Sequence, residues 1–372
     1  MHPQEQFCQN NDCPARGQIG KGNIRIHSRK DERYQCNVCK CTFTKTKDTL
    51  LYGLKKDQAE VIKVVTLLAY GCPIPAIVAA FGLDVRTIRS WLLKAGQHCQ
   101  GVHEHFLAQK ALDLQQVQAD EIKVKTQSGS IWMALAMMVS TRLWLAGAIS
   151  QKRDKVLIRD LADQLRSVAL CRNLLLAVDG LKSYIQAFQK AFRTPLPTGK
   201  RGRPKMIAWQ SILIVQVVKQ KRDGQFSIQR RIVQGSEYIV EQILQITQGA
   251  GVINTAYIER LNATFRQRMA VLARRTRHLA RKPETLQASM YLLGCVYNFC
   301  AFHKSLRLPL YVGERARKWV KRTPALAVGW ADHRWSMMEL LCFKVPPTPW
   351  QPPRRRGRPS KEMIRLVNQW CS

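Results

Sequence analysis

The feature that most constrains the fold is a change in hydrophobic periodicity near residue 115. Three strand-like runs come first, followed by a helical pattern, a fourth strand and a second helical pattern. These segments span 116–125, 131–139, 142–149, 153–169, 174–178 and 182–192. Short apolar or alternating runs predict strands, whereas apolar spacing of three to four predicts helices. The order predicts an α/β domain that begins with a three-stranded meander.

This order, three strands and then helix, strand and helix, is that of the ribonuclease-H-like fold. The segment from Ile207 to Gln234 alternates strongly, and it predicts a β-ribbon inserted in the same domain at about 195–236. The apolar stretch 131–149 superficially resembles a membrane span, but Arg142 near its centre would place a charge in the bilayer. We therefore expect two buried strands joined by a tight turn.

The 372 residues include 60 Lys and Arg against 25 Asp and Glu, which gives a formal charge of +35. Such a charge exceeds what solubility requires and favours a polyanionic partner, above all nucleic acid. A ribosomal-type structural protein and a membrane-surface protein are the alternatives. The first residues, MHPQEQFCQN, lack a basic start followed by an apolar run, so we expect no secretory signal and a cytoplasmic protein.

Five of the twelve cysteines lie in the first 41 residues. Two pairs among them have the spacing of a tetrahedral zinc site, and the predicted ligands are Cys8, Cys13, Cys36 and Cys39. Four thiolates around Zn²⁺ would replace the hydrophobic core that about 40 polar residues cannot build. Cys41 is an alternative to Cys39 as a ligand, and unrelated free thiols are the alternative to a metal site.

Residues 58–98 have the pattern of a helix-turn-helix unit. Apolar residues recur at helical spacing, a second helix is predicted over Ile74–Phe81, and Gly82 turns the chain. Asp84 can cap a third helix that extends through Trp91. Four polar residues of this helix lie away from its apolar face, as in a recognition helix: Arg86, Thr87, Arg89 and Ser90. A small helical bundle with an ordinary solvated face is the alternative.

Two acidic residues adjoin in the first predicted strand. Period two places Asp120 on one face with Ile122 and Val124, and Glu121 on the other face with Lys123. We therefore expect Asp120 to face inward and Glu121 outward. An inward carboxylate is costly unless it meets a metal ion or a positive charge, so a metal site and a buried salt bridge both explain Asp120.

Asp179 ends the apolar run LLLAVD and precedes a glycine, at the carboxyl end of a strand, where ligand sites are common. If this strand lies beside the first, Asp179 and Asp120 are close enough to share divalent cations. A helix cap is the alternative for Asp179. A third carboxylate, Glu259, lies on a predicted helix in line with Asn262 and Arg266. The alternative for Glu259, considered as a single residue in a helix, is a solvated surface glutamate.

Phosphodiester hydrolysis and transfer need one activated oxygen nucleophile and one stabilised leaving oxygen, which a pair of metal ions provides. Hard carboxylate ligands select Mg²⁺ or Mn²⁺ over Zn²⁺. Asp120, Asp179 and Glu259 are thus the predicted catalytic residues and magnesium ligands. Water would first expose a 3′-hydroxyl, which would then attack a second DNA strand.

Three segments resemble DDE transposases of bacterial insertion sequences, and the insertion sequence one group in particular. They are INTAYIERLNATFRQRM at 253–269, RRTRHLARKPETL at 274–286 and GCVYNFCAFHKSLR at 294–307. The resemblance extends from the cysteine knuckle YQCNVCKCTFT to about residue 310, and it implies that the family's two aspartates and glutamate correspond to Asp120, Asp179 and Glu259. It implies a DNA transposase that binds element ends and target DNA, acts as a homodimer or larger homo-oligomer, and associates with the nucleoid.

Further basic segments are predicted to contact DNA. Arg-Gly-Arg-Pro occurs at 201–204 and 356–359 and resembles an AT-hook, whose arginines enter a narrow minor groove; a charged linker is the alternative. An Arg-rich helix near Glu259 is predicted to bind phosphates. The arginines of these segments are Arg201, Arg203, Arg274, Arg277, Arg281, Arg356 and Arg358, and Asn262 and Arg266 are predicted to join them.

The sequence thus predicts a multidomain α/β protein. A zinc ribbon at 1–50 precedes a helix-turn-helix domain at 51–105, a ribonuclease-H-like catalytic domain at 106–310 and a basic region at 311–372. Two other functions remain open: a non-catalytic DNA-binding regulator whose acidic residues hold the fold together, and a nuclease or resolvase of the same fold.

Overall fold

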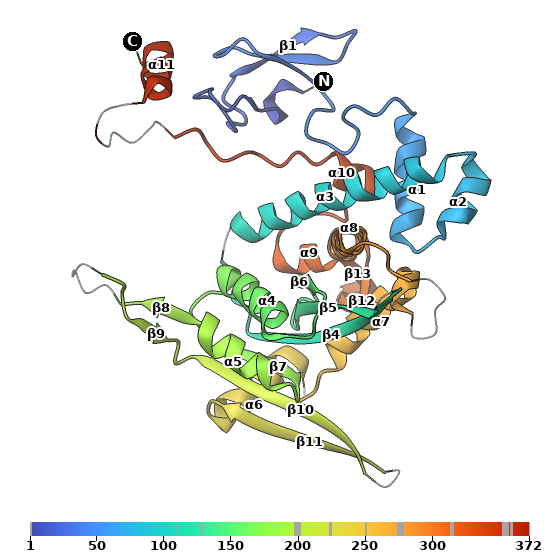
Figure 1. Ribbon diagram of the computed structural model, residues 1–372, viewed down its shortest axis with the longest axis vertical. Helices are drawn as coiled ribbons and strands as arrows, with labels where there is room; N and C mark the ends of the chain where they lie inside the picture. Colours follow the sequence, from blue (N-terminus) through green and yellow to red (C-terminus); the bar gives the residue numbers. More distant parts are fainter. Residues whose placement is uncertain are drawn as a thin grey trace. The chain divides into compact units, whose positions relative to one another are not determined.

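The structure is a computed structural model in which the chain forms two compact units (Figure 1). The smaller unit contains Met1–Lys55 and Cys342–Ser372, and the larger contains Lys56–Leu341. The structure describes residues 2–109, 111–127, 129–196, 202–222, 225–249, 251–273, 279–312, 316–351, 357 and 360–371. Within these ranges, none of the helices has the length and apolar character that crossing a membrane requires.

The smaller unit is built on a three-stranded antiparallel sheet. Its strands are β1 (Ile24–Ser28), β2 (Arg33–Cys36) and β3 (Thr42–Thr44), after a short 3₁₀ turn, η1 (Pro3–Glu5), and it also includes helix α11 (Lys361–Trp370). Ile24, Tyr34 and Phe43 form a small buried cluster together with three cysteines. So small an apolar cluster provides little stability by itself.

Three helices open the larger unit: α1 (Gln58–Ala69), α2 (Ile74–Phe81) and α3 (Val85–Gln109). Asp57 caps α1 by accepting a hydrogen bond from the Glu60 backbone N–H, and Gly82 ends α2 in the left-handed conformation. The first two helices match the sequence prediction. The third was predicted to end near Trp91 but continues to Gln109, because apolar residues keep their helical spacing, from Ala95 to Phe106, and are buried.

A six-stranded mixed sheet forms the centre of the larger unit, in the order β11-β10-β7-β4-β5-β6. Its strands are β4 (Gln116–Thr126), β5 (Gly129–Met138), β6 (Trp144–Ser150), β7 (Leu174–Asp179), β10 (Ile212–Arg222) and β11 (Gln225–Gln234). β4, β5 and β6 form the predicted antiparallel meander, while β7 runs parallel to β4, and β10 runs parallel to β7. The stretch that resembled a membrane span is the β5–β6 pair, with its turn at residues 139–141.

Helices cover both faces of this sheet. α4 (Lys155–Val168) and α5 (Lys182–Ala191) pack on the face that presents Val117 and Ala119. α6 (Glu237–Gln248) packs on the face that presents Leu175 and Ala177, and α7 (Ala256–Arg268) contacts β4 and β5. Because helices cover both faces, side chains on both sides of β4 are buried over most of the strand, and exposed ones occur only near its end.

The remaining elements include two hairpins, formed by β8 (Arg193–Pro195) with β9 (Met206–Ala208) and by β12 (His303–Val312) with β13 (Ala316–Arg322). The others are η2 (Ala270–Leu272), α8 (Pro283–Cys295), a π-helical turn η3 (Val296–Cys300), α9 (Pro324–Val328) and α10 (Met337–Cys342). α8 packs against α3.

The structure adds detail to two features of the predicted organisation. The segment Ile207–Gln234 contains an antiparallel ribbon, and β10 also pairs with β7 from Ile212 to Val217, so the ribbon extends the central sheet. The predicted boundaries at residues 105 and 310 divide segments that share one compact unit, because α3 packs on α8, and β13 and α9 also belong to that unit.

Candidate functional site

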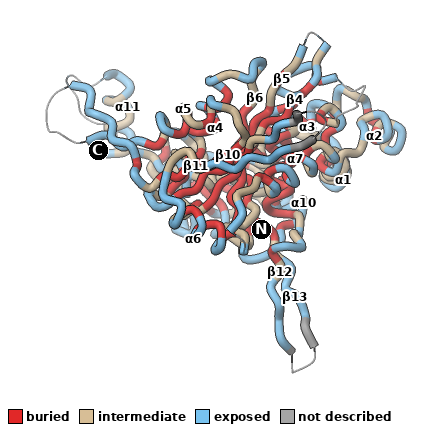
Figure 2. Tube along the Cα trace, turned by 90° about the horizontal axis from the view of Figure 1, so that it is seen from below, coloured by how far each residue is buried: buried red, intermediate tan, exposed pale blue. Residues whose placement is uncertain are grey.

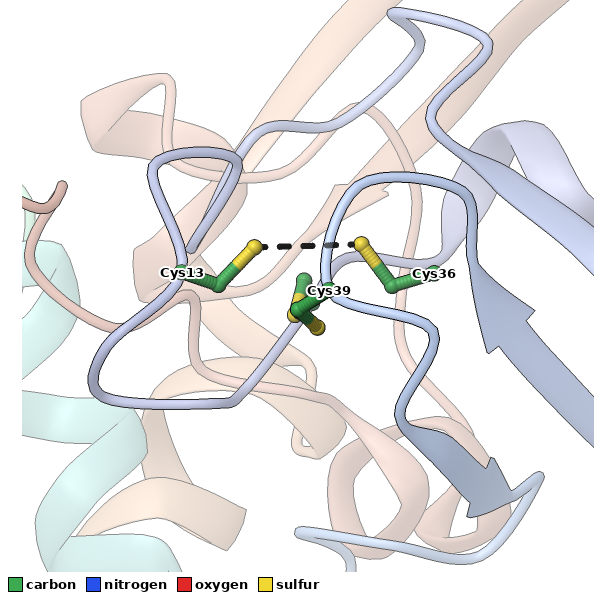
Figure 3. A group of neighbouring side chains, drawn as sticks. Cys13, Cys36 and Cys39 are labelled. Carbon is green, nitrogen blue, oxygen red and sulfur yellow. Dashed lines mark hydrogen bonds between the residues drawn. The ribbon is translucent and has the colours of Figure 1, made fainter. Parts of the chain in front are cut away.

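The four predicted cysteine ligands come together in the smaller unit. All four Sγ atoms of Cys8, Cys13, Cys36 and Cys39 lie within 4.8 Å of one another. The Cys8–Cys39 and Cys13–Cys36 Sγ distances are 3.5 and 3.9 Å, and Figure 3 shows the Cys13, Cys36 and Cys39 side chains pointing toward one another. Tetrahedral Zn–S bonds of about 2.3 Å place the sulfurs about 3.8 Å apart, so the cluster fits Zn²⁺.

The fifth nearby cysteine, Cys41, is exposed and outside this group. The geometry therefore favours Cys39 over Cys41 as the fourth ligand. Burial raises the pKa of Cys13 to about 12, so without a cation its thiol keeps its proton at neutral pH. Binding Zn²⁺ would release thiol protons, which makes the affinity of the cluster fall as the pH falls.

The three predicted carboxylates also come together, in the larger unit. Asp120 on β4, Asp179 at the end of β7 and Glu259 on α7 line one cavity of about 470 Å³. β4 and β7 are neighbours in the sheet, which explains why the two aspartates meet. Asp179 follows Asp120 by 59 positions in the sequence, and Glu259 follows Asp179 by 80.

Glu121 lies closer to the aspartates than the sequence predicted. One carboxylate oxygen from each of Asp120, Glu121 and Asp179 falls within a group spanning 4.8 Å. The expectation that Glu121 faces outward is wrong: its side chain has no exposed surface, because α4 and α5 cover that face of β4. Glu121 therefore forms a fourth carboxylate at this site.

Basic side chains lie against these carboxylates. Arg153 donates from Nη2 to Asp179 Oδ2 at 2.9 Å and to Glu121 Oε2 at 3.3 Å, and its guanidinium lies over the Trp132 ring. Lys219, on β10, donates to Glu259. Both cations line the cavity, so positive charge already compensates part of its negative charge. No motif or spacing in the sequence pointed to either residue.

Gln118 explains how a helix so distant in sequence reaches β4. Its buried Oε1 accepts hydrogen bonds from the Tyr257 and Ile258 backbone N–H groups, each at 3.0 Å, and its Nε2 donates to the Asn254 carbonyl. These bonds fix the first turn of α7 two residues from Asp120 on the same face of β4. A buried glutamine in a strand was the available signal, and it was missed.

Asn262 was predicted to contact DNA, and the structure gives it another role. The residue is fully buried, and its Nδ2 donates to Asp120 Oδ2 at 2.8 Å. Its Oδ1 has no hydrogen-bond partner among the described residues. Asn262 therefore orients Asp120 and places an amide oxygen close to it. Carboxylate and amide oxygens are ligands that Mg²⁺ and Mn²⁺ accept, so this donor set fits the predicted ion.

The environment shifts the pKa values of these groups in different directions. Burial raises the pKa of Asp120, and the charges of Asp179 and Glu259 raise it further against opposition from the Glu121 backbone N–H and Arg266. Burial, followed by the charge of Asp179, raises the pKa of Glu121 to about 7. Burial would also raise the pKa of Glu259, but hydrogen bonds from Lys219 and Thr255 lower it below its ordinary value.

The predicted recognition helix presents most of its polar residues to solvent. Arg86, Arg89 and Ser90 are exposed, Thr87 is half-buried, and Ile88 faces the core. The Asp84 carboxylate accepts a hydrogen bond from the Arg86 backbone N–H at 2.7 Å, as expected for the first turn.

The other predicted DNA-contacting residues are divided between exposed positions and positions that the structure leaves undescribed. Arg203 and Arg281 are exposed, and Arg266 is half-buried near Asp120. Arg201, Arg274, Arg277, Arg356 and Arg358 lie outside the described residues.

Comparison with known proteins adds no family assignment. Neither the protein-family models nor the curated proteins that were searched gave a match to this chain.

Proposed function

We propose that this protein is a DDE-type transposase that cuts the ends of a mobile DNA element and joins them to target DNA. The observation that supports this most strongly is the meeting of Asp120, Asp179 and Glu259 in one cavity, from three elements far apart in sequence. The resemblance to insertion-sequence transposases, which extends from the cysteine knuckle to about residue 310, implies roles for the same three residues. The charge of +35 suits a DNA substrate.

The architecture gives independent support. The order β6-β5-β4-β7-β10, with an antiparallel meander followed by two parallel strands, agrees with the ribonuclease-H-like core inferred from the sequence. In this proposal the cysteine cluster is a structural zinc ribbon, and α2 and α3 form a helix-turn-helix whose exposed Arg86 and Arg89 contact DNA.

In the proposed mechanism, Asp120, Asp179 and Glu259 would hold Mg²⁺ or Mn²⁺. When bound, a pair of such ions would provide activation of a water or 3′-hydroxyl and stabilisation of the leaving oxygen. Asn262 orients Asp120, and Gln118 keeps the glutamate-bearing helix against β4. Arg153 and Lys219 form ion pairs with Asp179 and Glu259, and both are long enough to turn toward a bound phosphate group. No covalent protein–DNA intermediate is needed.

A DNA-joining assay tests the proposal. A supercoiled plasmid carrying the gene with its flanking DNA is incubated with the full-length protein and Mg²⁺, and cut and joined products are separated on a gel. Asp120→Asn, Asp179→Asn and Glu259→Gln should each reduce joining about 10³-fold or more, because each loses several kcal/mol of metal-mediated stabilisation. Asp163→Asn, which changes an exposed aspartate on α4, is the matched control.

One observation favours a second candidate. Arg153 and Lys219 form ion pairs with the same carboxylates, and a non-catalytic DNA-binding regulator would keep such pairs purely to stabilise the fold. Specific DNA binding without cleavage under Mg²⁺ or Mn²⁺ would select the regulator. Cleavage without joined strands would select a nuclease or resolvase instead.

A further inference from the structure

The β12–β13 hairpin projects from the larger unit, as Figure 2 shows. We call its residues His303–Tyr311 and Lys318–Arg322 the basic arm. Its base is fixed: Leu306 is buried, and Arg322 Nε donates to the Leu306 carbonyl at 2.8 Å. Beyond the base, β12 and β13 pair in register from Leu308–Val320 to Val312–Ala316. The arm is therefore a regular two-stranded ribbon rooted in the core.

In its two described segments, 303–311 and 318–322, the basic arm has cationic side chains and no acidic ones. Its cations are Lys304, Arg307, Lys318, Lys321 and Arg322. None of them belongs to a salt bridge among the residues that the structure describes. Lys304, Lys318 and Lys321 are exposed. Because surface cations in folded proteins are usually interspersed with acidic groups, this one-sided charge indicates an anionic partner.

Large apolar side chains are exposed on the same ribbon. Leu308, Leu310, Trp319 and Val320 keep between 43% and 48% of their surface exposed. The register places Leu308 and Leu310 on one face with Val320, whereas Trp319 lies on the other face, where the Arg307 guanidinium stacks 3.9 Å from its ring centroid. A contiguous exposed patch of this kind marks a binding surface more often than an ordinary solvated one.

Charge decides between the two partners that such a surface could bind. A second copy of this chain would bring another +35 of net charge and another basic arm, so self-association through the arm is electrostatically opposed. Double-stranded DNA is a polyanion, and its major groove, about 12 Å wide, accepts a two-stranded β-ribbon. The five paired positions beyond the base extend about 17 Å, enough to reach into that groove.

We propose that the basic arm binds double-stranded DNA, with its lysines on phosphates and its apolar side chains against the groove wall. This inference rests on the proposed function only for the choice of DNA as the polyanion, and it does not involve the acidic cavity. The sequence prediction did not include the arm among the DNA-contacting segments. The arm would be a second DNA-binding site in the larger unit, in addition to the proposed helix-turn-helix.

The test compares two double variants of the full-length chain. Lys318→Gln with Lys321→Gln removes two charges from the arm, and Arg159→Gln with Lys190→Gln removes two charges from exposed positions on α4 and α5. Both are made in an Asp179→Asn background that does not turn over DNA. Affinity for a duplex of mixed sequence is measured by fluorescence anisotropy over a range of salt concentrations. Circular dichroism checks folding, and sedimentation gives the oligomeric state.

The arm variant should bind about tenfold more weakly at moderate salt, and its slope of log affinity against log salt should fall by about 1 to 2. The control variant should change both quantities much less, and Lys318→Arg with Lys321→Arg should restore binding. Equal losses in the arm and control variants would overturn the proposal, because total charge alone would explain them. A changed oligomeric state with unchanged DNA affinity would also overturn the proposal, because the arm would then bind a second copy of this chain. A negative result in the DNA-joining assay of the proposed function would not affect these measurements of DNA affinity, because binding is measured without cleavage or joining.

Discussion

The protein contains two clusters of metal-type ligands that differ in almost every physical respect. The cysteine cluster offers four soft ligands, three of them buried, in a unit whose apolar core is small. The acidic cluster offers hard oxygen ligands around an open cavity, on a sheet packed by helices on both faces. A closed tetrahedral set suits a structural ion, whereas an open set leaves positions for a substrate.

The two clusters also differ in how their charge is compensated. Arg153 and Lys219 already pair with the carboxylates, so the acidic cavity is partly neutralised by the chain itself. The buried Cys13 thiol instead stays protonated until a cation binds, as its raised pKa indicates. We infer that the smaller unit needs its ion to fold and that the larger unit folds first and binds its ions afterwards.

The strongest test of this difference is removal of zinc. Chelation, or Cys36→Ser, should unfold β1, β2 and β3, because structural zinc contributes on the order of 10 kcal/mol to folding in such small units. Hydrogen exchange should then become fast across residues 24–44, while β4 and β7 stay protected. Cys41→Ser is the matched control and should retain one zinc per chain. Protected strands in a zinc-free smaller unit would contradict the inference.

The second test removes one carboxylate from the acidic cavity. Asp120→Asn should weaken Mn²⁺ binding about 100-fold or more, because a hard cation loses a charged ligand. The metal-free larger unit should melt at the same or a higher temperature, since burial raises the pKa of Asp120 and its charged form is therefore unfavourable in the fold. Calorimetric titration and thermal unfolding measure the two effects. A large loss of stability would instead indicate a structural ion pair.

The contrast between the clusters also shows what the sequence could predict. The cysteine spacing identified all four members of the thiol cluster, since their two pairs are short local motifs. The strands of the meander and β7 appear within a few residues of their predicted bounds, because their apolar runs are long and regular. The sequence pointed to three carboxylates for different reasons. Asp120 interrupts an apolar pattern, Asp179 lies at the end of one, and Glu259 belongs to a distinctive segment.

What the sequence did not predict depends on tertiary contacts. Glu121 was assigned to solvent because period two gives the alternation of faces but not whether helices cover both of them. Arg153 and Lys219 reach the cavity from a loop and a strand that carry no motif. Asn262 was assigned to DNA because helical spacing places it in line with Glu259 and Arg266, whereas only the packing of α7 on β4 shows that Asn262 itself is buried.

A third test concerns Asn262, which belongs to the acidic cluster without a charge of its own. Asn262→Ala should lower Mn²⁺ affinity about 10- to 100-fold, because residues that hold a ligand in place usually have effects of this size. The Asp120 carboxylate would lose the 2.8 Å hydrogen bond that orients it. Gln267→Ala, at an exposed position on the same helix, controls for changes in α7. Unchanged affinity would show that Asp120 is oriented by other contacts.

The test with the smallest expected effect examines whether the chain's own cations compete with metal ions for the carboxylates of the acidic cavity. Arg153 pairs with Asp179 and Glu121 but is about one-third exposed, so solvent screens the interaction and each such pair contributes about 0.5–1 kcal/mol. Arg153→Gln should therefore tighten Mn²⁺ binding about two- to fivefold, and Arg159→Gln on the exposed side of α4 should leave it unchanged. Weaker binding in Arg153→Gln would mean that the arginine positions the carboxylates for the ion. The acidic cavity would then differ even more clearly from the cysteine cluster, because the chain itself would assemble the acidic site before its ion arrives.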